Sequence, residues 1–394
     1  MRRGQGRSRG RSALSSTADR QARRTRSEVI HMSAPITLVS LPSPAVSPSW
    51  KHLRHRLRAP RREPHAARGG PAATCRTSGV AEDRTPRACH RDAYGGCVPF
   101  PDLCSSAPLV LDGGLATELE ARGHDLSDEL WSARLLHDAP EEIVAAHEAF
   151  FRAGAVIATT ASYQASFPGF GARGIGRGDA AALMRRSVEL ARQAAERLEP
   201  DRPRWVAASV GPYGATLADG SEYRGRYGLT VSDLVGFHRP RLEVLAGAGP
   251  DVLALETVPD LDEAIALVEA VDGIGVPAWL SYTVADGRTR AGQPLAEAFE
   301  VARDHEDIVA VGVNCCSPAE VAPALAIARQ VTGKPVVAYP NSGEDWDAHC
   351  RTWTGASRFP GTAASAWAHE GAAVIGGCCR VRPDDIADLA ATLP

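Results

Sequence analysis

Three cysteines at the ends of two apolar runs are the side chains best suited to chemistry in this sequence. Cys315 follows Val-Gly-Val-Asn, and the pair Cys378 and Cys379 follows Val-Ile-Gly-Gly. Both runs are typical of strands, and the end of a strand is where a site would lie. Three thiolates with one open position are typical of a catalytic zinc site, in which a substrate thiol could supply a fourth sulfur. We therefore expect Zn²⁺ as the cofactor.

Other interpretations of these cysteines are open from the residues alone. A free cysteine is often a small buried hydrophobic residue, and Cys378 and Cys379 could form a vicinal disulfide or a redox pair. Neighbours in a strand point to opposite faces, but the two glycines before this pair have no Cβ atoms to resist a turn. Cys315 and Cys316 compete for one ligand position, and the other would pack or face solvent.

Eight apolar, β-branched runs alternate with helical patterns and would position these residues. The runs cover 109–112, 155–160, 205–210, 252–256, 278–283, 308–314, 335–339 and 373–376. Continuous apolar runs are typical of strands buried on both faces, as in a parallel sheet. Helical patterns begin at Pro140 and Pro383, each followed by two acids that suit a first turn. Eight β-then-α units predict an α/β fold, a (β/α)8 TIM-type barrel. A doubly wound sheet is the alternative, although no Gly-x-Gly-x-x-Gly follows the first strand.

Polar residues follow most of the predicted strands, at the end where barrel enzymes hold their chemistry. Glu256 ends an apolar run, where an unpaired carboxylate would be costly, so we expect it to meet a substrate ammonium or an arginine. Asp112 precedes two glycines, of which Gly113 is the first, and these could let backbone N–H groups approach a ligand. The plain alternative for Asp112 is a turn. Residues 219–225 are either a surface loop or a lid over the barrel mouth.

The first 107 residues differ in composition from the rest of the chain. They carry 20 Lys and Arg against 7 Asp and Glu, a net charge of about +13, whereas the remainder is about −16. No apolar period runs through them, so we expect 1–107 to be a disordered Arg-rich extension. It could be a translated leader upstream of a true start at Met32 or near residue 105, a basic tail touching nucleic acid, or an organelle transit peptide. No aromatic residues interleave with the arginines, so a nucleic-acid partner is not expected.

Apolar runs and cysteine usage together favour an intracellular protein. No stretch reaches the roughly 20 apolar residues of a membrane span, and no secretion signal is present. We expect no membrane contact and a cytoplasmic location. Reduced thiols there would favour a metal site over disulfides, although four of the nine cysteines lie in or beside the basic segment. The sequence carries no signal for an oligomeric state.

Several motifs of residues 108–394 resemble the homocysteine S-methyltransferases, most closely the bacterial branch that uses S-methylmethionine. The matching stretches are 111–123, 160–165, 209–215, 217–225, 237–241, 339–344 and 375–380. The resemblance implies that 108–394 form a homocysteine-binding (β/α)8 barrel domain. It implies zinc bound by Cys315 of an Asn-Cys motif and by Cys378 and Cys379 of Gly-Gly-Cys-Cys, and it places the homocysteine amino group near Asp112 and Glu256. Cys316, directly after the first of these ligands, departs from the common pattern.

The chemistry of such a reaction agrees with these residues. A free thiol titrates near pH ~8.5, and zinc deprotonates a coordinating thiol. The thiolate would attack a methyl group on a sulfonium sulfur, which leaves neutral, so we expect no catalytic residue beyond the zinc site. Aromatic faces for the donor cation could come from Tyr163, Tyr213, Tyr223 or Trp346. We expect the substrate-binding residues to be Asp112, Gly113, Tyr163, Tyr213, Glu256 and Asn314.

The predicted function is zinc-dependent methyl transfer from a sulfonium donor, foremost S-methylmethionine, to L-homocysteine, giving methionine. S-adenosylmethionine or betaine are alternative donors. A non-catalytic zinc or thiol-redox barrel protein is the alternative of another class.

Overall fold

The computed structural model describes residues 107–126, 132–347, 352–359 and 361–393. The predicted extension over 1–107 therefore lies, but for its last residue, outside the described residues. Eight parallel strands form one sheet in the order β1-β12-β9-β8-β5-β4-β3-β2. Their bounds are β1 Leu109–Val110, β2 Ile157–Thr159, β3 Trp205–Val210, β4 Val252–Val258, β5 Ala278–Tyr282, β8 Ile308–Asn314, β9 Val336–Tyr339 and β12 Ala372–Ile375.

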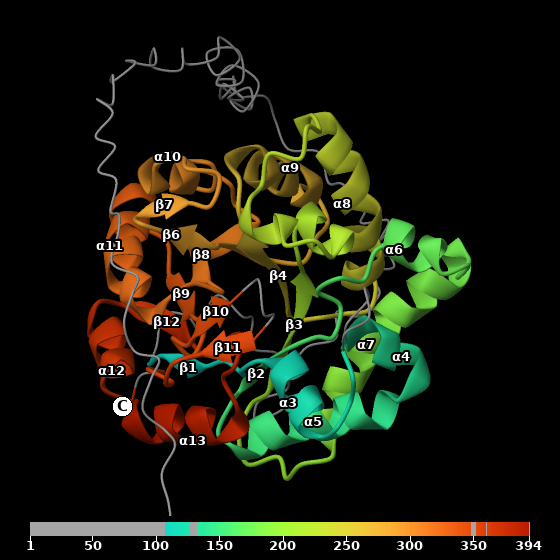
Figure 1. Ribbon diagram of the computed structural model, residues 1–394, viewed down its shortest axis with the longest axis horizontal. Coiled ribbons are helices and arrows are strands. Elements are labelled where there is room, and N and C mark those ends of the chain that lie inside the picture. The colour runs from blue at the N-terminus through green and yellow to red at the C-terminus, as the bar shows by residue number, and fades with distance from the viewer. Residues whose placement is uncertain (1–106, 127–131, 348–351, 360, 394) are drawn as a thin grey trace, which may run out of the picture. The chain divides into compact units, whose positions relative to one another are not determined.

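The sheet closes on itself where its first two strands meet. Leu111 bridges Ile157 in parallel, Val156 N donates to Val110 O at 2.8 Å, and Asp112 N donates to Ile157 O at 3.0 Å. Figure 1 shows the resulting ring of strands with helices around it. Each predicted apolar run overlaps one of these strands, so the predicted (β/α)8 barrel is confirmed.

Helices follow the strands and cover the outside of the barrel (Figure 1). They are α3 Leu115–Ala121, α4 Ser132–Asp138, α5 Pro140–Arg152, α6 Phe167–Ala172, α7 Arg177–Glu196, α8 Val231–Ala246, α9 Leu261–Val271, α10 Leu295–Glu300, α11 Val321–Thr332, α12 Gly361–His369 and α13 Pro383–Thr392. Both helices predicted from a proline start, α5 and α13, begin at that proline with two acids in the first turn. Proline has no N–H to leave unpaired there, and the acids interact favourably with the helix dipole.

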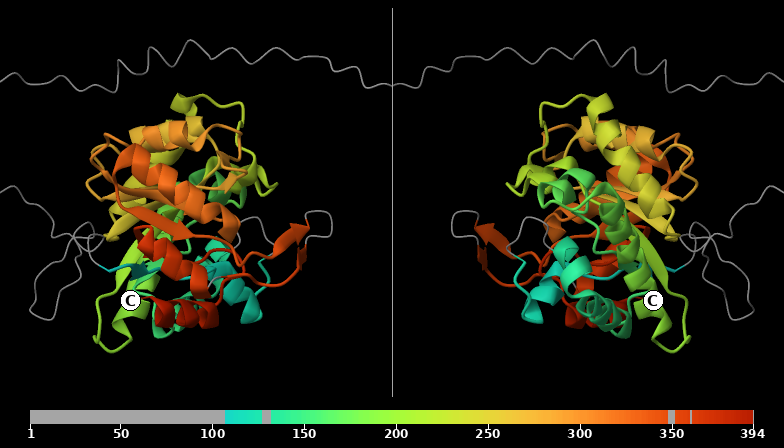
Figure 2. Two further views of the ribbon diagram at one scale, coloured as in Figure 1. Left: turned by 90° about the vertical axis from the view of Figure 1, so that its left-hand side faces the viewer. Right: turned by 90° about the vertical axis from the view of Figure 1, so that its right-hand side faces the viewer.

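Short helices and strands lie in the loops at the carboxyl ends of the barrel strands. They are the 3₁₀ helices η1 Tyr213–Leu217, η2 Ser221–Tyr223 and η3 Pro318–Glu320, and the two-stranded ribbons β6 Val284–Ala285 with β7 Arg288–Thr289 and β10 Asp345–Asp347 with β11 Thr352–Thr354. Figure 2 shows the β10–β11 ribbon projecting from the body of the barrel.

The strands are buried on both faces, which explains why they read as continuous apolar runs. A central cluster includes Trp205, Trp279 and Tyr339. Trp279 Nε1 donates to the Tyr339 hydroxyl at 2.9 Å, so the polar atoms of these two rings are paired inside the core. Among the described residues, no helix is both long and apolar enough to cross a membrane.

Candidate metal centre and active site

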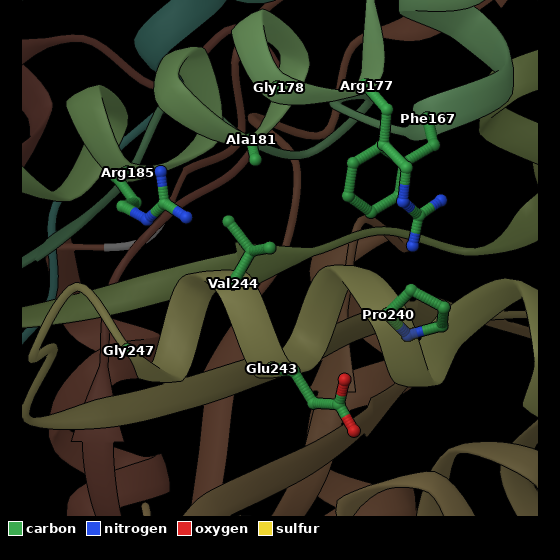
Figure 3. Close-up of a pocket in the computed structure, with 9 residues that line it drawn as sticks. All are labelled: Phe167, Arg177, Gly178, Ala181, Arg185, Pro240, Glu243, Val244 and Gly247. Atoms are coloured by element: carbon green, nitrogen blue, oxygen red, sulfur yellow. The ribbon is translucent and has the colours of Figure 1, made fainter.

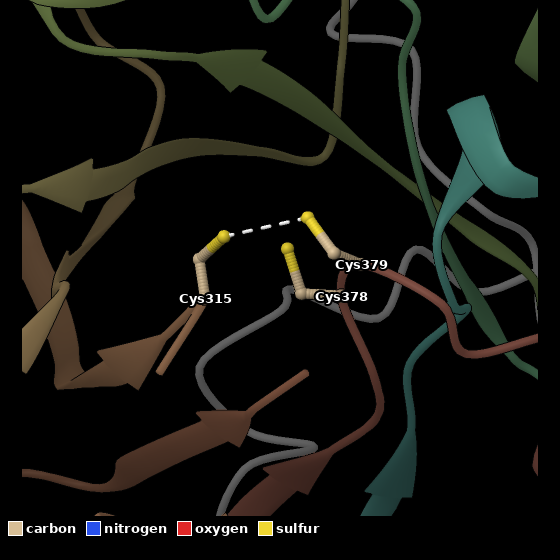
Figure 4. A group of neighbouring side chains, drawn as sticks. All are labelled: Cys315, Cys378 and Cys379. Carbon is tan, nitrogen blue, oxygen red and sulfur yellow. Dashed lines mark hydrogen bonds between the residues drawn. The ribbon is translucent and has the colours of Figure 1, made fainter. Parts of the chain in front are cut away.

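Three cysteine sulfurs meet at the carboxyl end of the barrel. Cys315 follows β8, whereas Cys378 and Cys379 follow β12, and their sulfur atoms all lie within 4.8 Å of one another. Figure 4 shows the three side chains converging. The sulfurs of Cys315 and Cys379 are 3.6 Å apart. In a tetrahedral site with Zn–S bonds of about 2.3 Å, neighbouring sulfurs are about 3.8 Å apart. The spacing of this donor set therefore fits a metal ion.

The backbone at Cys315 turns sharply at the end of β8. Cys315 has φ 49°, a left-handed conformation that is uncommon outside glycine. The turn is held by a hydrogen bond from Cys315 N to Tyr339 O at 3.2 Å and by one from Thr283 Oγ1 to Cys315 O at 3.1 Å. Cys316 is buried, at 1% exposure, and its sulfur is not among the three that meet.

Close packing explains the two glycines before the cysteine pair. A Cβ atom at Gly376 would lie 2.6 Å from the Leu111 Cβ, and one at Gly377 would collide with the side chain of Val381. The sequence suggested that these glycines ease a turn. The structure shows that Gly376 lets the cysteine loop lie against the residues that follow β1 and that Gly377 leaves room for Val381, and neither glycine has a positive φ. The loop is then fixed by Cys379 N donating to Asn341 Oδ1 at 3.1 Å.

The thiols of the cysteine pair differ in how readily they lose a proton. Hydrogen bonding with Cys315 raises the pKa of the Cys378 thiol and lowers the pKa of the Cys379 thiol. Thiolates, not thiols, bind metals. A metal cation bound between the three sulfurs would take the place of the protons that the thiols otherwise carry.

Two buried carboxylates lie toward the carboxyl ends of β1 and β4, which are not adjacent in the sheet, and their charges interact. Asp112 accepts hydrogen bonds from Thr159 N at 2.8 Å and from Thr159 Oγ1 at 2.9 Å. Glu256 accepts one from Ser209 Oγ. Burial, with a smaller contribution from the charge of Glu256, raises the pKa of Asp112 well above its usual range. Burial also raises the pKa of Glu256 to about 7. Because each carboxylate is hard to ionise alone, a shared cation would stabilise both.

Asn314 and Gly113 have structural partners that the sequence did not reveal. Asn314 Oδ1 accepts from Thr257 N at 2.7 Å and from Ser281 Oγ at 2.8 Å, so this amide ties the end of β8 to β4 and β5 just before Cys315. A Cβ atom at Gly113 would lie 2.6 Å from Val381 O. The N–H group of Gly114 donates to Val381 O at 2.9 Å. This N–H group is therefore already paired, whereas the sequence predicted that it would approach a ligand. Substrate contacts at Asn314 and Gly113 stay predictions.

The two tyrosines predicted to contact substrate lie in different surroundings. Burial first, and then the charges of Glu222 and Cys315, raise the pKa of Tyr163, so this ring is buried and interacts electrostatically with the cysteine centre. The Tyr213 ring instead packs against the rings of Tyr227 and Phe237, with centroids 5.2 Å and 5.0 Å away. Tyr163 is thus linked to the cysteine centre by charge, whereas Tyr213 lies in an aromatic cluster beside α8.

Residues 211–227, here called the mouth loop, fold over the cysteine centre. The Tyr223 hydroxyl lies 2.9 Å from Cys315 Sγ. The loop is anchored from below by Glu263, which accepts hydrogen bonds from Tyr213 N at 2.5 Å and from Tyr227 Oη at 3.0 Å. This arrangement favours the lid interpretation of residues 219–225 over that of a plain surface loop.

Sequence reasoning missed the acids that serve this loop. Glu263 lies inside the apolar helix α9 and looked like an ordinary first-turn acid. Glu222 lies in the polar run Gly-Ser-Glu-Tyr, yet it is 7% exposed, and burial raises its pKa to about 7. The one signal that could have pointed to Glu222 is its position next to Tyr223.

A separate cavity of about 540 Å³ lies on the outside of the barrel, between α7 and α8. Figure 3 shows its lining, which includes Arg177, Arg185 and Glu243. None of the cysteines or buried acids described above lines it.

Comparison with known proteins gives the class of this protein. Residues 109–393 match the family model described as homocysteine S-methyltransferase. The chain therefore belongs to this family, and it is a methyltransferase enzyme.

Individual relatives support this family assignment. The homocysteine S-methyltransferase YbgG of Bacillus subtilis is 43% identical over 306 residues, which cover 74% of this chain and 97% of the relative. The homocysteine S-methyltransferase of Escherichia coli is 46% identical over 292 residues, covering 72% and 94%. Among solved structures, the metallated form of the homocysteine methyltransferase MmuM from E. coli matches with a TM-score of 0.68 and 43% identity, covering 74% of this chain and 98% of that one.

Proposed function

We propose that this enzyme transfers a methyl group from S-methylmethionine to the thiol of L-homocysteine, at a zinc ion held by Cys315, Cys378 and Cys379. The observation that carries the proposal is the meeting of three sulfurs within 4.8 Å at the carboxyl end of the barrel. The match to a metallated relative supports a metal at this position. Zinc is favoured because an all-thiolate set with tetrahedral spacing suits it.

Bound zinc would supply Lewis acidity, which keeps the homocysteine sulfur deprotonated at neutral pH. The protein's own residues orient that substrate. Asp112 and Glu256 hold the α-ammonium group of homocysteine. Both carboxylates are buried and have no cation partner among the described residues, so a substrate ammonium group would stabilise them. Tyr163 is buried and interacts electrostatically with both Glu256 and Cys315, and we propose that its ring helps to exclude water from the site.

The reaction itself needs only alignment. The homocysteine sulfur forms a bond to the methyl carbon while the carbon–sulfur bond of the sulfonium breaks, and the electron pair of that bond stays on the departing sulfur. The sulfonium becomes a neutral thioether, so no proton has to be donated to the leaving group. With S-methylmethionine, both products are methionine. The chain's task is to hold the two sulfurs and the methyl carbon in line.

Among the alternatives, S-adenosylmethionine and betaine compete as donors. A non-catalytic zinc or redox barrel is not favoured, because it would give no task to Asp112 or Glu256, and because the chain belongs to an enzyme family.

A donor panel tests the proposal. The full chain is incubated with L-homocysteine and either S-methylmethionine, S-adenosylmethionine or betaine, and methionine is quantified by chromatography. We expect the highest kcat/KM with S-methylmethionine and loss of activity after zinc chelation that added zinc restores. No methionine from any donor would overturn the proposed function, and a preference for another donor would overturn its donor.

We further propose that residues 108–394 are the complete catalytic domain and that the basic extension is dispensable. The first strand begins at Leu109 and the family match begins at the same residue. A chain starting at Ser105 should keep its zinc and its methyl transfer. The free thiols of the site also require a reducing compartment, which makes the cytoplasm the proposed location.

A further inference from the structure

Glu222 is a buried acid that the reaction outlined above does not use. It lies in η2, and the residue is 7% exposed. Within the described part of the chain, no group donates a hydrogen bond to its Oε2 atom. A buried carboxylate oxygen without a partner is destabilising. Such a group calls for an explanation, and a ligand that supplies the missing donor is one.

Its neighbours place Glu222 beside the three-cysteine centre. The next residue, Tyr223, has its hydroxyl 2.9 Å from Cys315 Sγ. The charge of Glu222 also acts on Tyr163, whose pKa is raised by burial first and then by this carboxylate. Glu222 therefore lies on the mouth-loop side of the centre. Asp112 and Glu256 approach from the strand ends β1 and β4.

No cation of the described chain neutralises Glu222 by direct contact. The closest basic residue in sequence is Arg224, which is 65% exposed on its side chain and pairs with Asp219 at 3.8 Å. Its guanidinium also donates to Ser221 Oγ at 2.5 Å. Among the described ion pairs, none includes Glu222. The mouth of the barrel thus has one buried carboxylate more than the amino group of homocysteine needs.

We propose that Glu222 binds the α-ammonium group of the methyl donor. This inference rests on the proposed function, and it narrows the donor to an amino acid that carries a sulfonium group. Such a donor has two cationic groups, which play different parts. The sulfonium loses its charge as the methyl group leaves, so a carboxylate held against it would stabilise the ground state more than the transition state. The ammonium keeps its charge throughout, so binding it adds affinity without slowing the transfer.

The assignment also discriminates between donors. S-methylmethionine offers N–H groups that can satisfy the buried Oε2 atom. Betaine has a quaternary nitrogen without N–H groups and would leave that atom unpaired, which is a strong basis for rejection.

The test compares Glu222→Gln with the wild-type chain in steady-state kinetics. Glutamine keeps the shape and removes the charge, so KM for S-methylmethionine should rise roughly ten- to a hundredfold. KM for homocysteine, kcat and zinc content should change little. Asp219→Asn is the matched control, because it removes one charge from the same loop at a side chain that is 53% exposed. It should leave KM for the donor unchanged.

Two further measurements make the result decisive. Glu222→Asp keeps the charge on a shorter side chain and should give a donor KM between those of the wild type and Glu222→Gln. The wild type should also prefer S-methylmethionine to its N-acetyl derivative, and Glu222→Gln should reduce that preference. An unchanged donor KM in Glu222→Gln, or a rise shared equally by homocysteine, overturns the role of Glu222. Failure of the wild type itself to use S-methylmethionine would instead overturn the proposed function.

Discussion

The hydroxyl group of Tyr223 lies 2.9 Å from the sulfur of Cys315, although 92 positions separate the two residues in the chain. Tyr223 belongs to the mouth loop after β3, and Cys315 directly follows β8. The contact joins the covering loop to the cysteine centre, so the position of the loop and the state of the sulfur depend on each other.

Replacing Tyr223 with phenylalanine tests this contact. Burial raises the pKa of Tyr223 well above its usual range, so the hydroxyl stays protonated and is able to donate to a Cys315 thiolate. Losing one hydrogen bond of this kind should lower kcat/KM roughly five- to tenfold while zinc stays bound. Unaltered kinetics together with unaltered zinc content would show that the contact has no part in the reaction.

Glu256→Gln tests the recognition of homocysteine. The substitution removes a charged partner of the substrate ammonium but keeps the side-chain shape, so KM for homocysteine should rise about ten- to a hundredfold. Zinc should remain, since Glu256 is not among the three sulfur donors. A homocysteine KM equal to that of the wild type would refute the role of this carboxylate.

Gly377→Ala tests the packing that positions the cysteine pair. A methyl group there would collide with Val381, so the loop carrying Cys378 and Cys379 has to move. We expect lost zinc and activity, with a barrel that still folds by circular dichroism. Gly236→Ala in α8 is the control, because a Cβ atom there meets nothing within 4 Å and helices favour alanine. Retained zinc in Gly377→Ala would mean that the loop tolerates displacement.

His147 in α5 predicts how stability depends on pH. Its ring is fully buried, neither nitrogen has a partner among the described residues, and burial lowers its pKa from 6.5 to about 4. The unfolded chain therefore binds a proton more readily than the folded one below pH 6.5. The contribution of the neutral ring to the free energy of unfolding is fully present above pH 6.5. It is lost as the pH falls toward 4, which lowers the free energy of unfolding by roughly 3 kcal/mol.

His147→Leu should remove that part of the acid sensitivity, because leucine cannot be protonated. Urea unfolding of both chains at several pH values between 4 and 7 measures the difference. Parallel pH dependences for the two proteins would rule out a titrating His147.

The barrel was predictable because its strands are buried on both faces, which gives each of the eight runs the same apolar signature. The cysteines were predictable as a group because they follow those runs directly. The burial of the acids in and beside the mouth loop was not predictable from such a pattern. Glu222 and Glu263 resemble solvent-exposed acids in the sequence, and only the folded chain shows that both are buried. The packing of the Tyr213 ring against Tyr227 and Phe237 was also not predictable, because it is a contact between segments that no local pattern encodes.

The most direct test of the three-cysteine zinc centre is the zinc content of four single variants, each measured by mass spectrometry alongside methionine formation from homocysteine and S-methylmethionine. The wild type should carry about one zinc per chain, and Cys315→Ala, Cys378→Ala and Cys379→Ala should each lose most of it together with activity, because two thiolates cannot complete the site. Cys316→Ala should keep both, since its sulfur lies outside the group. Loss of zinc in Cys316→Ala with zinc retained in Cys315→Ala would contradict the assignment.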